Sequence, residues 1–222
     1  MTTPKWLTFD AYGTLVDFAL DQTTVDVLES RLDGIDVDAF LKRYQRIRFE
    51  ETFGTYKPYR DVLRRSLKRI ATEFNIVLRD GDGDALIAAV PTYGPFPDVP
   101  PVLERLRQHC KLAIISNTEN DLFQGNLDKL GVPIDRVFTA EQIGAYKPSL
   151  FAFRYMLHEL DVSWNEVVHI AQGFDYDIRP AHELGLKKIW INRRGLTGDP
   201  AFQPWIDLPD LTGVPEQIGI SS

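Results

Sequence analysis

Residues 7–15 read Leu-Thr-Phe-Asp-Ala-Tyr-Gly-Thr-Leu, and here an apolar run that begins at Trp6 ends in the carboxylate of Asp10. A glycine follows three residues later, at Gly13, and then comes Thr14. Ligands of parallel α/β sheets bind beyond the carboxyl ends of the strands. A buried strand that delivers an aspartate to this edge, with a flexible turn behind it, can therefore aim a nucleophile into a crevice. The alternative is an aspartate that only caps a turn.

The composition fits a soluble globular protein of one large or two small domains: 222 residues, 44% of them hydrophobic and 26% charged. The net charge of −7 argues against a nucleic-acid partner, which would favour clustered lysine and arginine. An anionic substrate would therefore need locally placed cations. The one cysteine, Cys110, cannot form an internal disulfide, and without a cysteine cluster we expect no thiolate zinc site.

The N-terminus lacks the basic segment and long apolar run of a signal peptide. No stretch approaches the roughly 18 apolar residues of a membrane helix. We therefore expect a cytoplasmic protein without a membrane partner.

Apolar residues fall at helical spacing from Thr23 to about Ala89, in a block that holds many charges and no convincing strand. This block predicts a small helical unit. The proline- and glycine-rich stretch 91–101 then suggests a return linker, and Asp98 within it can cap the next helix.

Beyond this linker the chain alternates short apolar strands with helices. The strands are expected at 112–115, 136–139, 167–171 and, as the last one, 188–191. Alternation with short links predicts a parallel sheet covered on both faces, which is an α/β fold. We expect His169 to be a half-buried strand residue, and no histidine has a partner at metal-ligand spacing.

Polar side chains follow the predicted strands at their carboxyl ends. They are Asp10, Ser116, Asn117, Lys147, Gln172, Asp175 and Asp177. In a parallel sheet these groups converge on one edge, where a carboxylate nucleophile, a hydroxyl and amide pair, a cation and a second carboxylate would share a pocket. Taken singly, each also has an ordinary interpretation as a turn, capping or surface residue.

Four motifs in this order resemble those of the haloacid dehalogenase (HAD) superfamily of hydrolases, over nearly the whole chain. They are Asp10-Ala-Tyr-Gly-Thr14, Ser116-Asn117, Lys147-Pro148 and Asp177, which lies eight residues before Gly185. The resemblance implies a doubly wound parallel-sheet (Rossmann-like) core domain formed by residues 1–15 and 93–222. Residues 16–92 take the place of the family's inserted α-helical cap domain.

Two positions separate this chain from the metal-dependent phosphatases of the superfamily. Those enzymes have acids where this chain has Tyr12 and Gln172, and Mg²⁺ needs anionic oxygen ligands. The form Asp-Ala-Tyr-Gly-Thr resembles the 2-haloacid dehalogenases. The resemblance therefore implies a hydrolase that converts a short 2-haloacid to a 2-hydroxyacid without a metal or another cofactor.

Two alternatives stay open. One is a phosphatase of the same superfamily that holds Mg²⁺ through Asp175 or Asp177. The other is a weakly active or inactive relative that binds a small carboxylate or a protein partner. Gln172, Phe174 and Phe153 keep the second alternative open, because they replace a serine, an asparagine and a tyrosine of the dehalogenases.

The resemblance implies five catalytic residues. Asp10 would attack the carbon that bears the halogen and form an ester, and Asp177 would position or deprotonate the water that hydrolyses it. Lys147 would keep Asp10 ionised. Thr14 and Ser116 would hydrogen-bond carboxylate oxygens.

The substrate-binding residues implied by the resemblance are Tyr12, which would wall the pocket, Asn117, which would polarise the leaving halide, and Gln172. The family also places an arginine of the cap over the halide. Gln45 is the aligned residue here, so Arg46 or Arg48 would serve instead, and Arg46 is the preferred candidate. The partner implied is a small anionic haloacid, and the family allows a homodimer.

Overall fold

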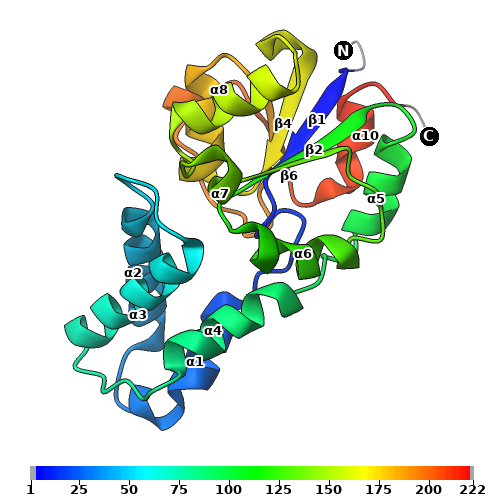
Figure 1. Ribbon diagram of the computed structural model, residues 1–222. Helices are drawn as coiled ribbons and strands as arrows, with labels where there is room; N and C mark the ends of the chain where they lie inside the picture. Colours follow the sequence, from blue (N-terminus) through cyan, green and yellow to red (C-terminus); the bar gives the residue numbers. More distant parts are fainter. Residues whose placement is uncertain (1–3, 221–222) are drawn as a thin grey trace.

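A six-stranded parallel sheet forms the centre of the larger part of the molecule in the computed structural model, which describes residues 4–220 (Figure 1). The strands are β1 (Trp6–Phe9), β2 (Lys111–Ser116), β3 (Arg136–Thr139), β4 (Val167–Ala171), β5 (Lys187–Ile191) and β6 (Ile206–Leu208). Their order is β3-β2-β1-β4-β5-β6, and every neighbouring pair is parallel. The strand order reverses beside β1, which is where doubly wound sheets bind their ligands.

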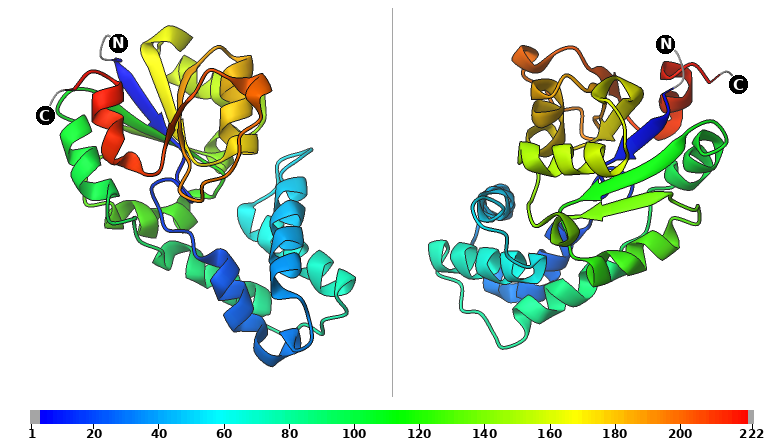
Figure 2. Two further views of the ribbon diagram at one scale, coloured as in Figure 1. Left: turned by 180° about the vertical axis from the view of Figure 1, so that it is seen from behind. Right: turned by 45° about the horizontal axis from the view of Figure 1, so that its top comes forward.

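Helices cover both faces of the sheet (Figure 2). One face packs on α5 (Val99–Leu106), α6 (Asn120–Lys129) and α10 (Val214–Gln217), and the other on α7 (Ala140–Ile143), α8 (Leu150–Glu159) and α9 (Arg179–Glu183). Side chains alternate across a strand. In β2, Leu112 and Ile114 accordingly join the first apolar cluster, and Ala113 and Ile115 join the second. The doubly wound α/β fold expected from the sequence is confirmed.

The four remaining α-helices form a second unit (Figure 1), whose apolar cluster also takes in Leu122, Ala140 and Tyr146 of the sheet part. They are α1 (Leu20–Leu28), α2 (Val37–Glu51), α3 (Tyr59–Glu73) and α4 (Asp82–Ala89). The remaining elements of the described chain are the π-helix η4 (Phe174–Ile178) and five short 3-10 turns: η1 (Glu29–Leu32), η2 (Val90–Thr92), η3 (Trp164–Glu166), η5 (Pro200–Phe202) and η6 (Leu211–Gly213). The helical character predicted for this block is confirmed, and we propose domain boundaries after residues 15 and 92.

The chain enters and leaves the helical unit at one place. The backbone N–H of Asp17 donates to the carbonyl of Gly94 at 2.9 Å, and that of Phe96 donates to the carbonyl of Leu15 at 3.0 Å. The outgoing and returning segments are therefore hydrogen-bonded to each other directly behind the turn that follows β1.

Two details differ from the sequence expectations. The strand at 188–191 is not the last one, because β6 adds an edge strand that is too short to show a periodic pattern. Asp98 lies at the N-terminus of α5 but makes no side-chain capping bond. Its carboxylate instead accepts two hydrogen bonds from the guanidinium of Arg193, at 3.0 and 2.9 Å.

Within residues 4–220, every helix is too short or too polar to span a lipid bilayer.

Candidate active site

The first strand places Asp10 at the carboxyl edge of the sheet, beside the reversal of strand order. The backbone N–H of Asp10 still bonds to Ile170 of β4, at 3.1 Å, so the nucleophile candidate is anchored to the sheet. The chain then turns tightly, with Gly13 at a φ of 84°. A glycine suits this position for two reasons. It adopts the left-handed backbone conformation without steric strain, and any other residue would place its Cβ 3.0 Å from the side-chain oxygen of Gln172.

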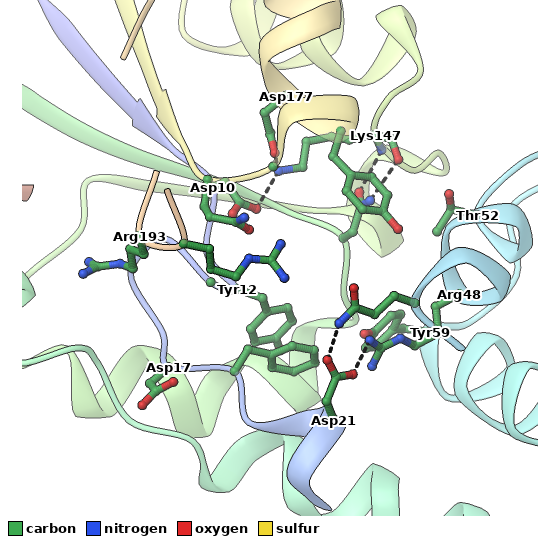
Figure 3. A pocket seen from close by; sticks show the side chains of 18 of the residues that line it. Asp10, Tyr12, Asp17, Asp21, Arg48, Thr52, Tyr59, Lys147, Asp177 and Arg193 are labelled. Atoms are coloured by element: carbon green, nitrogen blue, oxygen red, sulfur yellow. Dashed lines mark hydrogen bonds and ion pairs between the residues drawn. The ribbon is translucent and has the colours of Figure 1, made fainter. Parts of the chain in front are cut away.

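Lys147 joins the two carboxylates of the site (Figure 3). Its Nζ lies 2.8 Å from Oδ1 of Asp10 and 2.7 Å from Oδ1 of Asp177, and its side chain is only 2% exposed. Thr14 donates its hydroxyl to the other Asp10 oxygen, Oδ2, at 2.6 Å. Both oxygens of Asp10 are therefore held by donors that favour the ionised carboxylate.

Burial and charge act in opposite directions on these groups. Burial raises the pKa of Asp10 above the usual aspartate range, although the Lys147 ammonium opposes this shift. Burial would also raise the pKa of Asp177, but Lys147 and His169 outweigh it and hold this pKa below the usual range. Burial alone would lower the pKa of Lys147, whereas the two carboxylates hold it above its usual value. Lys147 therefore remains charged between them.

One oxygen of Asp177 is free. Oδ1 accepts from Lys147 and lies 3.1 Å from Nε2 of His169, whereas Oδ2 is buried and has no hydrogen-bond partner in the described part of the chain. Gly173 leaves the space beside this atom, because a Cβ at that position would lie 2.5 Å from Oδ2. A carboxylate with one fixed and one free oxygen can accept a proton from a water molecule.

We expect Gly173→Ala to displace the Asp177 carboxylate. The backbone of Gly173 is ordinary, with a φ of −71°, so the added methyl group acts through its contacts: the clash with Asp177 and a weaker one with the Cβ of Tyr176 at 3.2 Å. The cost is about 1–3 kcal/mol of folding stability together with a loss of turnover of tenfold or more. Urea unfolding and steady-state rates measure both effects. Gly94→Ala is the matched control, since its Cβ would meet no atom within 4 Å; equal effects of the two variants would contradict the prediction.

The residues after β2 take different positions. Asn117 binds the backbone of Lys147 on both sides, because its Nδ2 donates to the Lys147 carbonyl at 2.9 Å and its Oδ1 accepts from the Lys147 N–H at 2.8 Å. Ser116 is buried, but its hydroxyl has no hydrogen-bond partner among residues 4–220. Ser116 therefore makes no bond to a carboxylate of the described residues, and its role towards a carboxylate stays a prediction.

Tyr12 and Gln172 line the cavity above Asp10, as predicted. The ring of Tyr12 stacks on Phe18 with 4.2 Å between centroids, and its hydroxyl donates to Oδ1 of Asn126 at 3.1 Å. The backbone N–H of Gln172 donates to the Thr14 hydroxyl at 2.8 Å. Where phosphatases of the superfamily would carry acids, this chain has an aromatic wall and a neutral amide.

The structure does not bring Arg46 to the cavity. Its side chain is 61% exposed and lies near Glu50 and the ring of Phe49. Arg48 and Gln45 line the cavity instead. On a helix of 3.6 residues per turn, positions 45 and 48 share a face that position 46 does not, so helical spacing would have favoured Arg48.

Arg48 is held from the cap side of the cavity (Figure 3). Its Nη2 donates to Asp21 at 2.7 Å, and its guanidinium lies over the ring of Tyr44, 4.6 Å from the centroid. Gln45 also donates to Asp21. Nη1 of Arg48 is buried and lacks a partner in the described chain, so one donor of this cation is available to a ligand.

The cavity between sheet edge and helical unit has a volume of about 580 Å³. The sequence interpretation missed several of its lining residues, because they come from separate elements that only the fold brings together. They are Asp17, Phe18, Asp21, Thr52, Tyr59, Phe96, Tyr176, Arg193 and Arg194.

A magnesium site of the phosphatase type does not fit the residues present. No cluster of three or more potential metal ligands of the His, Cys, Asp and Glu types occurs in residues 4–220. Asp175 is exposed and pairs with Arg179 at 3.1 Å, and Asp177 is already bound by the ammonium of Lys147. Since Tyr12 and Gln172 supply no charge, Asp10 has no second free carboxylate with which to share a hard divalent cation.

Comparisons with known proteins agree with this geometry. Residues 4–185 match the family model of haloacid dehalogenase-like hydrolases. The (S)-2-haloacid dehalogenase 4A of Burkholderia cepacia is 26% identical over 203 residues, which cover 88% of this chain and 86% of that protein. The glyceraldehyde 3-phosphate phosphatase of Methanopyrus kandleri is 28% identical over 171 residues, or 70% and 73% of the two chains.

Among solved structures, L-2-haloacid dehalogenase from Xanthobacter autotrophicus, with chloropropionic acid covalently bound, superimposes with a TM-score of 0.81. The match covers 100% of both chains at 18% identity, and at this identity it shows a shared fold. The family-model match extends over most of the chain and includes all four motifs that follow the strands. This protein therefore belongs to the haloacid dehalogenase-like hydrolases.

Proposed function

We propose that this hydrolase is a metal-independent 2-haloacid dehalogenase, which converts a short 2-haloacid to the 2-hydroxyacid through an ester on Asp10. One observation carries the proposal: Asp10 lines the cavity with Lys147 and Thr14 on its oxygens, and the uncharged Tyr12 and Gln172 stand where the superfamily's phosphatases carry acids. A phosphate ester needs a proton for its leaving alkoxide, whereas a halide leaves without one. The site is therefore built for a leaving group that needs no general acid.

In the first step, a carboxylate oxygen of Asp10 bonds to the carbon that carries the halogen, and the carbon–halogen bond breaks with both electrons leaving on the halide. The free Nη1 donor of Arg48 and the amide of Asn117 are the candidate ligands of the departing anion. Once Asp10 is an uncharged ester, the ammonium of Lys147 pairs with the carboxylate of Asp177.

In the second step, water attacks the carbonyl carbon of the ester. Oδ2 of Asp177 accepts the proton, and the oxygen of the water stays in the Asp10 carboxylate. The oxygen that attacked in the first step leaves with the product and takes one proton of the water to become its hydroxyl group. The other proton of the water is released to solvent, which leaves Asp177 ionised again. Each turnover thus exchanges one oxygen of the enzyme.

The relatives support this choice. The relative from Burkholderia cepacia is a 2-haloacid dehalogenase and aligns over 88% of this chain. The phosphatase relative from Methanopyrus kandleri aligns over less of it, 70%, so a phosphatase remains the second candidate. An inactive binder of small carboxylates is the third.

The deciding experiment measures halide release from each enantiomer of 2-chloropropionate in the presence of EDTA. We expect chloride and lactate in equal amounts. In parallel, 4-nitrophenyl phosphate is offered with and without Mg²⁺. Phosphate release that requires Mg²⁺, without any halide release, would identify the phosphatase instead. A folded enzyme inactive in both assays, and on fluoroacetate as a further haloacid, would favour the binder.

Arg48→Ala is expected to lower kcat/KM for the haloacid by about 10–100-fold, because a hydrogen bond to a charged group contributes about 1.5–3 kcal/mol. Arg48→Lys should fall between this variant and the wild type, since it keeps the charge opposite Asp21 but loses the planar fork. Arg46→Ala, on the same helix, is the control and should stay within about twofold. A larger loss in the Arg46 variant than in the Arg48 variant would favour Arg46 as the arginine that contacts the halide.

A further inference from the structure

A histidine that the reaction above does not use lies directly behind Asp177. His169 is the middle residue of β4 and is completely buried, not half-buried as its strand position suggested. Its Nδ1 lies 2.9 Å from the hydroxyl of Thr8, and its Nε2 lies 3.1 Å from Oδ1 of Asp177. Thr8 is its cross-strand neighbour in β1, so the sheet register itself sets the first contact.

These contacts determine which nitrogen carries the proton. Oδ1 of Asp177 is an acceptor only, so Nε2 must be the donor in that contact. Thr8 can adapt, because its hydroxyl donates to a neutral Nδ1 or accepts from a protonated one. Phe153 packs edge-on against the imidazole with 5.3 Å between the ring centroids, so the ring has little freedom to turn.

Lys147 and His169 together saturate one oxygen of Asp177. Lys147 approaches Oδ1 at 2.7 Å, and His169 approaches the same atom from within the sheet. Lys147 also donates to the carboxylate of Asp10, whereas Asp177 is the one carboxylate that His169 contacts among the described residues. Rotation of the Asp177 carboxylate would break the contact to His169, so His169 fixes which oxygen is bound and leaves Oδ2 without a partner in the described chain.

We propose that His169 is a positioning residue for the hydrolytic half of the reaction: it holds Oδ1 of Asp177 so that Oδ2 stays free for the attacking water. The inference rests on the proposed function for its kinetic consequence. His169 touches neither the halogen nor the carbon that carries it, so its contribution belongs to ester hydrolysis and not to ester formation.

His169→Phe tests this division, because the variant keeps an aromatic ring beside Phe153 and removes both nitrogens. In rapid-mix experiments with 2-chloropropionate we expect the first halide release within about threefold of the wild type. Hydrolysis of the ester should slow by about 10–100-fold, which is part of what a positioned general base contributes. The Asp10 ester should then accumulate and be visible by mass spectrometry of the intact protein. His169→Gln, which retains an N–H donor, should recover part of the hydrolysis rate.

Equal slowing of both half-reactions, or a slow variant without accumulated ester, would overturn the inference. If the wild type releases no halide from any haloacid, the proposed function fails, and a second measurement still decides the placement of the proton. In protein with ¹⁵N-labelled histidine, we expect the Nε2 of His169 to carry hydrogen and its resonance to move in Asp177→Asn. Thr8→Val, which leaves the Asp177 contact in place, should chiefly move the Nδ1 resonance. A neutral ring protonated only at Nδ1 would contradict the inference directly.

Discussion

Asp10→Asn is expected to abolish halide release, with a loss of kcat of about 10⁴-fold or more, the scale seen when a catalytic nucleophile is removed. The amide cannot displace a halide, yet it is nearly isosteric: its oxygen can still accept from Lys147, and its NH₂ group can donate to the Thr14 hydroxyl. The fold and the substrate affinity should therefore survive. Halide release and haloacid binding, measured on the same sample, separate lost chemistry from lost structure.

Asp175→Asn is the matched control for this variant, because its carboxylate belongs to the same edge of the sheet but is exposed and pairs with Arg179. It should keep wild-type turnover within about twofold. A single turnover in H₂¹⁸O gives an independent check: the label should appear in Asp10 and be absent from the hydroxyacid. Label in the product alone would mean that water attacks the substrate directly.

Lys147→Met is expected to lower both turnover and stability. The variant leaves two buried carboxylates without their cation, and breaking a buried ion pair from one side costs about 3–5 kcal/mol. With the ammonium absent, the pKa of Asp10 and that of Asp177 should rise in the folded protein. Asp177 would then lose the ionised form that accepts the proton of water, so turnover should fall at least 10²-fold at neutral pH.

The stability loss has a defined pH dependence. A carboxyl group whose pKa is higher in the folded than in the unfolded state favours folding at low pH, and this contribution is lost as the pH rises through the folded pKa. The deficit of Lys147→Met should therefore be largest at pH 7 and shrink towards pH 4. Urea unfolding of variant and wild type at both pH values measures it. A deficit that stays constant with pH would show that packing, not charge, is the cause.

Much of this site could be predicted because parallel sheets collect the residues that follow their strands. Asp10, Lys147 and Asp177 lie far apart in the sequence, yet each follows a strand or its link, and hydrogen bonds of 2.7–2.8 Å join them. Buried strands are also short apolar runs with clear boundaries, so five of the six were recognisable. The placements follow from topology, whereas the catalytic roles of these residues remain predictions.

What the sequence did not reveal depends on side-chain direction. Arg46 and Arg48 are the same residue type two positions apart, and the face of α2 on which each lies turns Arg48 to the cavity and leaves Arg46 exposed. A histidine in a strand gives no sign of its neighbours until the register pairs it with Thr8. The edge strand β6 is only three residues long, which is too short for any periodicity.

The paired backbone segments behind the nucleophile turn have a consequence for how such an enzyme can diversify. The chain enters the helical block at Asp17 and leaves it at Gly94, and the N–H of Asp17 donates to the carbonyl of Gly94. Both ends of the block are therefore anchored at one point of the sheet domain. Insertions whose ends lie close together are the ones a fold tolerates. Recombination could exchange the whole block as a unit and so alter the lining of the cavity, while Asp10, Lys147 and Asp177 of the sheet domain would be inherited unchanged.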